Sequence, residues 1–89
     1  MTISIFDESE RRKLAAWNKA NLVAGFDPRV WRKDRFGLWM KFDQYGKRSQ
    51  YGWEIDHVWP LSLGGLFGMD NEVATNWVAN RIKSNKFIG

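Results

Sequence analysis

The chain has 89 residues, which is enough for one domain with a small core. It contains no cysteine, so disulfides and thiolate zinc sites are excluded, and it shows neither a signal peptide nor a membrane span. The net charge of +4 favours a polyanionic partner. The expected setting is the cytoplasm, with no membrane partner. Six Trp, six Phe and two Tyr are expected to supply most of the core.

The N-terminal part of the chain predicts a helix over residues 7–20. Asp7 is a suitable N-cap, and Glu10 follows it at capping-box spacing. Leu14 and Trp17 lie three residues apart and share one face of this helix. We therefore expect Trp17 to anchor the core.

The segment from Arg29 to Arg48 is basic, with seven basic and two acidic residues. Arg32 and Lys33 lie beside Trp31 in this segment. Such a pattern is typical of a segment that follows the phosphate backbone of a nucleic acid. It is also typical of a surface strand whose aromatic side chains face inward. We favour phosphate contact for Arg32 and Lys33.

Two strands and a helix are predicted in the second half of the chain. Residues 51–58 are rich in strand formers, and Pro60 ends the run. We expect this strand to pair with residues 36–42 in a small antiparallel hairpin. After a loop, residues 73–75 predict a short strand and residues 77–86 a helix.

Polar and glycine residues stand at defined points of this strand–loop–strand–helix order. They are Asp56, His57, Pro60, Gly64, Gly65, Asn71, Asn80 and Lys83. Together they resemble the HNH endonuclease family, in a subgroup of small bacterial or phage proteins. The resemblance implies an α+β fold, a single HNH domain over residues 1–89 whose ββα-metal core spans about 51–87, with the N-terminal helix and a small antiparallel hairpin added.

The resemblance also implies catalytic roles. His57, the only histidine, would be the general base, in keeping with a side chain that titrates near neutral pH. Asn71 would hold the loop and orient that base, using an amide that donates and accepts at once. Asp56 would be a metal ligand. A regular strand points neighbouring side chains to opposite faces, so Asp56 and His57 share a site only if the strand bends or ends there.

The remaining metal ligands implied by the resemblance are amides. Asn80 matches the last ligand position, and Asn76 stands where relatives often have histidine, as a weak oxygen ligand or as no ligand. Amide and carboxylate oxygens suit hard cations. We therefore expect one loosely bound divalent metal, Mg²⁺ or Mn²⁺.

Nucleic-acid contacts are expected along the last helix and the basic segment. Lys83 matches the final lysine of the motif and would neutralise a phosphate. The other expected contacts are Arg81, Lys86, Arg32 and Lys33. Leu66 and Phe67 replace small polar residues of the loop, and they either form a partner or self-association surface or fold back onto the core.

The expected function is thus a metal-dependent DNA endonuclease or nicking enzyme, with RNA also open as a substrate. The alternative is a catalytically weak HNH-fold module that binds nucleic acid, and the asparagine at position 76 is its best support.

Overall fold

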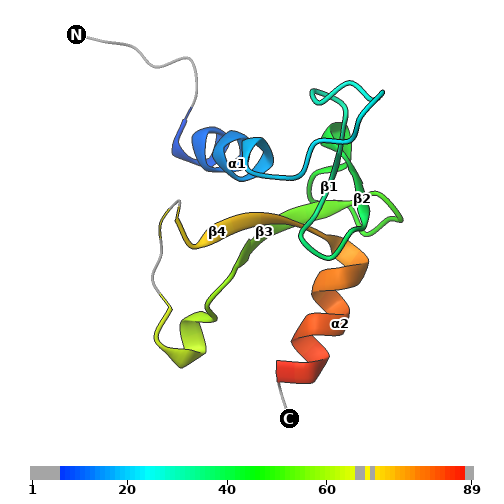
Figure 1. The fold of residues 1–89 in the computed structure, drawn as a ribbon. Helices are drawn as coiled ribbons and strands as arrows, with labels where there is room; N and C mark the ends of the chain where they lie inside the picture. The colour runs from blue at the N-terminus through cyan, green and yellow to red at the C-terminus, as the bar shows by residue number, and fades with distance from the viewer. Residues whose placement is uncertain (1–6, 66–67, 69, 88–89) are drawn as a thin grey trace, which may run out of the picture.

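The computed structural model describes residues 7–65, 68 and 70–87, with side chains up to residue 83. Within these ranges the chain forms two α-helices and two antiparallel two-stranded sheets (Figure 1). The elements are α1 (Glu8–Asn18), β1 (Trp31–Lys33), β2 (Trp39–Lys41), β3 (Trp53–His57), β4 (Glu72–Asn76) and α2 (Trp77–Phe87). The α+β class and the predicted strand–loop–strand–helix order are present, and the HNH family assignment stays a prediction.

Helix α1 begins where the sequence predicts. The Asp7 side chain caps it by accepting a 2.8 Å hydrogen bond from the backbone N–H of Glu10. The helix ends at Asn18, two residues before the predicted end. Beyond it, the Arg32 guanidinium donates to the carbonyls of Asn18 and Ala20, at 3.2 and 3.3 Å. These bonds fix the chain as it leaves the helix.

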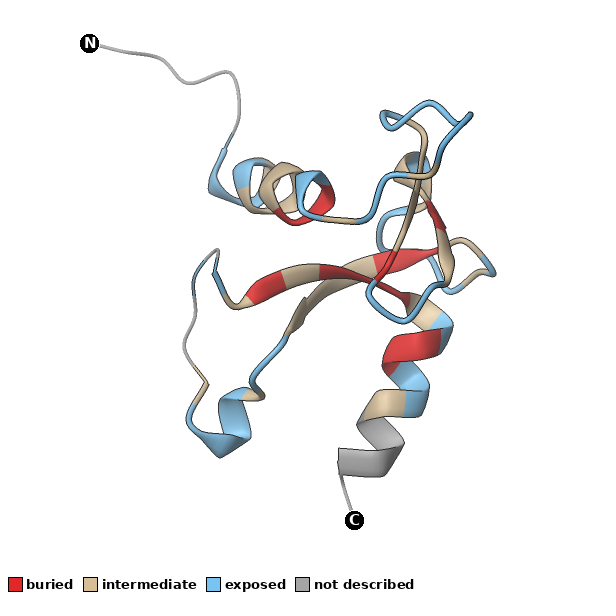
Figure 2. Cartoon of the chain, in the orientation of Figure 1, coloured by how far each residue is buried: buried red, intermediate tan, exposed pale blue. Residues whose placement is uncertain are grey.

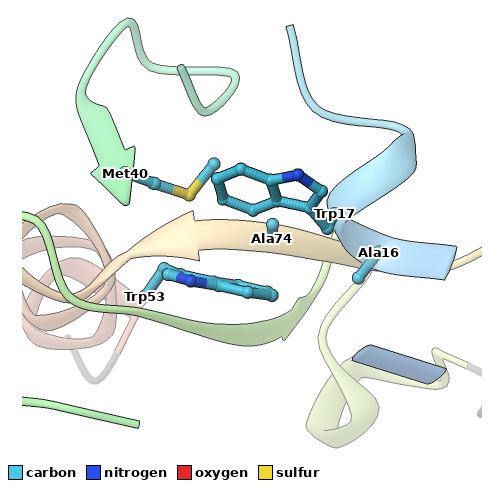
Figure 3. Packing of buried hydrophobic residues seen from close by; sticks show 5 residues of the cluster. All are labelled: Ala16, Trp17, Met40, Trp53 and Ala74. Atoms are coloured by element: carbon cyan, nitrogen blue, oxygen red, sulfur yellow. The ribbon is translucent and has the colours of Figure 1, made fainter. Parts of the chain in front are cut away.

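The core lies between α1 and the β3–β4 hairpin, as Figure 3 shows. The Trp17 ring packs against the Trp53 ring at 5.0 Å between centroids, and the prediction that Trp17 anchors the core is confirmed. Both indole N–H groups are satisfied: Trp17 donates to the Pro28 carbonyl and Trp53 to the Phe42 carbonyl. Each tryptophan therefore buries its apolar area without leaving a polar group unpaired.

The predicted pairing of residues 36–42 with 51–58 is wrong. Strand β2 pairs with β1, with Arg32 opposite Met40, while β3 pairs with β4, with Ile55 opposite Ala74. The cause is a tight turn at Asp34, whose carboxylate accepts hydrogen bonds from the backbone N–H groups of Phe36 and Leu38. This turn folds β2 back onto the strand immediately before it.

Two buried polar side chains connect this turn to the start of α2. Asp34, fully buried, accepts from the backbone N–H of Asn76 at 2.9 Å. The Asn76 amide donates to the carbonyls of Trp39 and Gln50, both at 2.8 Å. Its oxygen accepts from the N–H of Val78 at 2.8 Å and so caps α2. Figure 2 shows the buried residues concentrated along β4 and where it passes into α2.

The β3–β4 loop closes on its own backbone. A side chain at Gly65 would place its Cβ 1.9 Å from the carbonyl oxygen of Trp59, so only glycine fits there. Leu66 and Phe67, predicted as a partner surface or core residues, lie outside the described residues. In the part of the chain that is described, neither helix has the length and apolarity needed to cross a bilayer.

We predict that Asp34→Ala strongly destabilises the fold. The substitution leaves the backbone N–H groups of Phe36, Leu38 and Asn76 without their acceptor. The expected loss in the free energy of unfolding is about 3 kcal/mol, measured by urea denaturation. Asp43→Ala is the matched control, because this exposed carboxylate accepts one side-chain hydrogen bond from Gln44. Equal losses in the two variants would contradict the prediction.

Candidate functional site

The β3–β4 hairpin separates the candidate site residues between its two faces. Strand β3 is regular through His57, its last residue. Glu54 and Asp56 consequently face α2, whereas Ile55 and His57 face α1. The strand ends at this point, as a shared site requires, but it does not turn Asp56 and His57 to the same face.

On the α2 face, Asp56 lies between two cations. Its Oδ2 atom is 2.8 Å from the Lys83 ammonium and 3.3 Å from a guanidinium nitrogen of Arg35. Both Asp56 and Lys83 are mostly buried, with 13% and 14% of their side chains exposed. Lys83 also reaches the backbone carbonyl of His57, at 3.5 Å. The Asp56–Lys83 ion pair therefore connects the end of β3 to the middle of α2.

Glu54 extends this polar cluster by one pleat of the strand. Its Oε1 atom accepts from the Asn80 amide at 2.6 Å and also pairs with Arg81. Glu54, Asp56 and Asn80 thus offer carboxylate and amide oxygens on the same side of the hairpin. Within the described residues, no group of three His, Cys, Asp or Glu side chains is placed to hold a metal. Carboxylate and amide oxygens are the ligand types that hard cations prefer, and both carboxylates are paired here with Lys or Arg side chains.

On the α1 face, His57 lies against a buried acid. Its Nε2 atom is 3.7 Å from an Oε2 atom of Glu72, the residue directly opposite on β4. Glu72 is only 2% exposed, and Arg12 of α1 pairs with both of its oxygens. The side-chain hydrogen bonds from Arg12 hold the pKa of Glu72 below its ordinary value, against the opposing effect of burial. Glu72 is therefore an ionised neighbour of the imidazole.

Asn71 fixes the backbone that follows His57. Its side-chain oxygen accepts from the N–H of Trp59 at 2.8 Å, and its amide donates to the Trp59 carbonyl at 3.0 Å. Its own carbonyl accepts from the N–H of Val58 at 2.9 Å. Three hydrogen bonds from one residue thus hold the end of β3 and the start of the loop.

Other predicted site residues are placed elsewhere. The Asn76 side chain donates to the carbonyls of Trp39 and Gln50, and its oxygen caps α2 by accepting from the N–H of Val78. Arg32 donates to three backbone carbonyls, including Pro28 at 2.9 Å, and its burial lowers its pKa. The ammonium nitrogen of Lys33 lies 4.9 Å from the centre of the Trp39 ring. The side chain of Lys86 lies outside the described part of the chain.

A groove of about 550 Å³ opens beside Asp56, between the β1–β2 turn and α2. Its lining combines apolar side chains such as Phe36 and Ile82 with the two cations that hold Asp56, Arg35 and Lys83. The candidate site is thus a polar strand end bordered by an open, partly apolar depression.

Four residues of this site were missed by the sequence reasoning: Glu54, Glu72, Arg12 and Arg35. Glu54 has a local signal, because it stands two residues before Asp56 on one strand and must share its face. The others have none, since Arg12 and Glu72 are 60 residues apart and Arg35 and Asp56 are 21 apart. Only the tertiary fold brings these partners together.

Comparison of the chain with models of protein families, with curated proteins and with solved structures found no match.

We predict that Glu72→Gln makes stability less dependent on pH in acid. The pKa of Glu72 is lower in the folded chain than its ordinary value of 4.5. The ionised carboxylate therefore stabilises the fold above pH 4.5, and this contribution is lost as the pH falls through the folded pKa. Urea denaturation between neutral pH and about pH 3 measures this slope. Arg12→Gln should flatten the same region, and a wild-type slope in both variants would refute the assignment.

Proposed function

We propose that the chain is a metal-dependent endonuclease or nicking enzyme of the HNH type, acting on DNA. The observation that carries the proposal is the Asn71 clamp on the backbone directly after His57. A residue held so firmly at a strand end, beside acidic and amide side chains, suits a preorganised catalytic group. The single histidine and the hairpin–helix order support the same conclusion.

His57 would act as the general base. Its Nε2 atom is buried and faces Glu72, so Nδ1 is the nitrogen that would take the proton from the attacking water. The imidazole becomes positive when it accepts that proton. The ionised Glu72, held by Arg12, would stabilise this charge and keep the ring in one orientation.

The scissile phosphate would bind across the edge of β3. Asp56 and His57 are neighbours in the strand, so their side chains leave the backbone about 3.3 Å apart along it and on opposite sides. A phosphate at the strand edge would meet both. Lys83, Arg35 and Arg81 lie on the α2 side and would neutralise it and its neighbour.

Asp56 and Asn80 are the residues that would hold a divalent cation, with Glu54 next to both. A bound Mg²⁺ or Mn²⁺ would stabilise negative charge on the phosphate and its leaving oxygen. Asn76 is not part of the proposed set, because its oxygen caps α2. The protein's part is to keep Asp56 at the strand end and to release it from Lys83 when the cation binds.

One observation favours the alternative, a module that binds nucleic acid without cutting it. Asp56 is neutralised by Lys83 and Arg35 within the chain itself. A carboxylate paired in this way is stable without any metal. Under this alternative, Lys83 and Arg35 would serve only the fold and phosphate binding.

We predict that His57→Ala lowers cleavage of supercoiled plasmid in Mg²⁺ or Mn²⁺ by about a hundredfold or more. The variant lacks the group that removes the proton from water, while DNA binding in EDTA should persist. Asp43→Ala, a change far from the strand end, is the control and should cut like wild type. Cleavage at the wild-type rate by His57→Ala would end the nuclease proposal. A salt-sensitive gel shift with no cutting would establish the alternative.

We predict that Lys83→Met tightens Mn²⁺ binding in the absence of DNA. The ammonium 2.8 Å from Asp56 competes with a cation for the same oxygen, and methionine keeps the length of the side chain without its charge. Calorimetric titration should show an affinity gain of about tenfold. Lys47→Met, which removes one exposed charge from the loop before β3, is the control. Unchanged Mn²⁺ affinity in Lys83→Met would place the cation away from Asp56.

A further inference from the structure

A second pocket lies on one face of the β1–β2 hairpin, and it shares no lining residue with the groove beside Asp56. It has a volume of about 240 Å³ and is lined by Phe26, Trp31, Trp39 and Tyr51. The rings meet edge to face, with centroids 4.8 Å apart for Phe26 and Trp39 and 5.1 Å apart for Trp31 and Tyr51. Edge-to-face packing leaves ring surface open toward the pocket.

These four rings differ from the aromatic residues of the core. Trp17 and Trp53 are 2% and 0% exposed, whereas Phe26 is 49% exposed. Trp31, Trp39 and Tyr51 are all partly exposed. The segments that carry them lie within residues 7–65, every one of which is described. Partly exposed rings around a hollow are suited to stacking on a flat ligand.

The charges around the pocket are positive. The Lys33 ammonium lies 4.9 Å from the centre of the Trp39 ring, and the Lys41 ammonium lies 5.7 Å from that of Trp31. Within the described ranges neither ammonium forms an ion pair, and the nearby Asp27 is neutralised by Arg29 at 3.0 Å. A cationic ligand is disfavoured, because the two lysine ammonium groups would repel it. The complementary ligand combines a flat ring with negative charge.

We propose that this pocket binds single-stranded nucleic acid, with an unpaired base against the four rings and the flanking phosphates on Lys33 and Lys41. Base stacking on aromatic side chains is strong and tolerant of sequence, and lysines track the backbone. A duplex keeps its bases stacked on one another, so it offers this pocket phosphates only. The β1–β2 hairpin reaches Asp56 through Arg35 at its turn, so one strand of nucleic acid can extend from the pocket toward the strand end.

This inference goes beyond the proposed cleavage and does not depend on it. Binding is measured in EDTA, where no metal-dependent cutting occurs, by fluorescence anisotropy of labelled oligothymidylate and oligouridylate. If the nuclease proposal fails, the binding result still stands. If binding fails while plasmid is cut, the pocket proposal alone is lost.

The charge test compares two double variants that lose the same two positive charges. Lys33→Gln/Lys41→Gln should weaken oligomer binding by about tenfold, because both phosphate contacts at the pocket are lost. Lys47→Gln/Arg48→Gln removes two exposed charges from the following loop and should weaken it by less than about threefold. Equal losses of oligomer affinity in the two double variants would mean that only the net charge matters, and this would overturn the proposal.

The stacking test uses exposed apolar residues. Phe26→Ala should weaken single-strand binding by about tenfold, since one ring of the pocket is removed. Leu22→Ala, at a site 69% exposed and outside the pocket, should bind like wild type. Duplex binding should be weaker than single-strand binding and should not respond to Phe26→Ala. A duplex that binds as tightly as the single strand, or an acidic peptide that competes equally well, would overturn the proposal. Comparison of the DNA and RNA oligomers shows which of the two nucleic acids the pocket prefers.

Discussion

The fold depends on the buried residues Asp34 and Asn76, which lie 42 residues apart and are joined by a hydrogen bond from the backbone N–H of Asn76 to the Asp34 carboxylate. The Asp34 carboxylate accepts hydrogen bonds from backbone N–H groups of both the β1–β2 turn and the start of α2. The Asn76 amide in turn holds the carbonyl of β2 and caps the helix. A buried polar group without partners is costly, so all of these bonds must form together. In a chain without cysteine, this junction specifies one arrangement of the hairpin, the connector and the helix.

That junction fixes the β3–β4 hairpin between two helices, and the hairpin then has two chemically different faces. The α1 face combines the tryptophan core with the His57, Glu72 and Arg12 contact. The α2 face carries Glu54 and Asp56, each neutralised by cations of α2 or of the β1–β2 turn. Neighbouring residues of one strand therefore experience different surroundings. A catalytic site built on Asp56 and His57 has to use the edge of the strand, where both faces are within reach.

Features set by local sequence were predictable, and features set by distant pairing were not. The Asp7 cap, the tryptophan anchor and the strand–loop–strand–helix order follow from neighbouring residues. The pairing of β2 was wrong because the Asp34 carboxylate organises a turn that folds β2 back onto β1. For Arg32, expected to contact phosphate, the sequence did not show that its guanidinium donates to the backbone carbonyls that follow α1. In both cases a charged residue serves the backbone, and no local pattern separates that role from solvent exposure.

The charges around Asp56 link the binding of anions and cations under the proposed function. Lys83 and Arg35 hold the carboxylate in the free protein. A phosphate at the strand edge would attract both cations and so weaken their hold on Asp56. The carboxylate would then be available to a metal, whose charge in turn favours the phosphate. Because such coupling is reciprocal, each ligand would raise the affinity for the other. Loose metal binding in the free protein would then be a consequence of the ion pairs that hold Asp56.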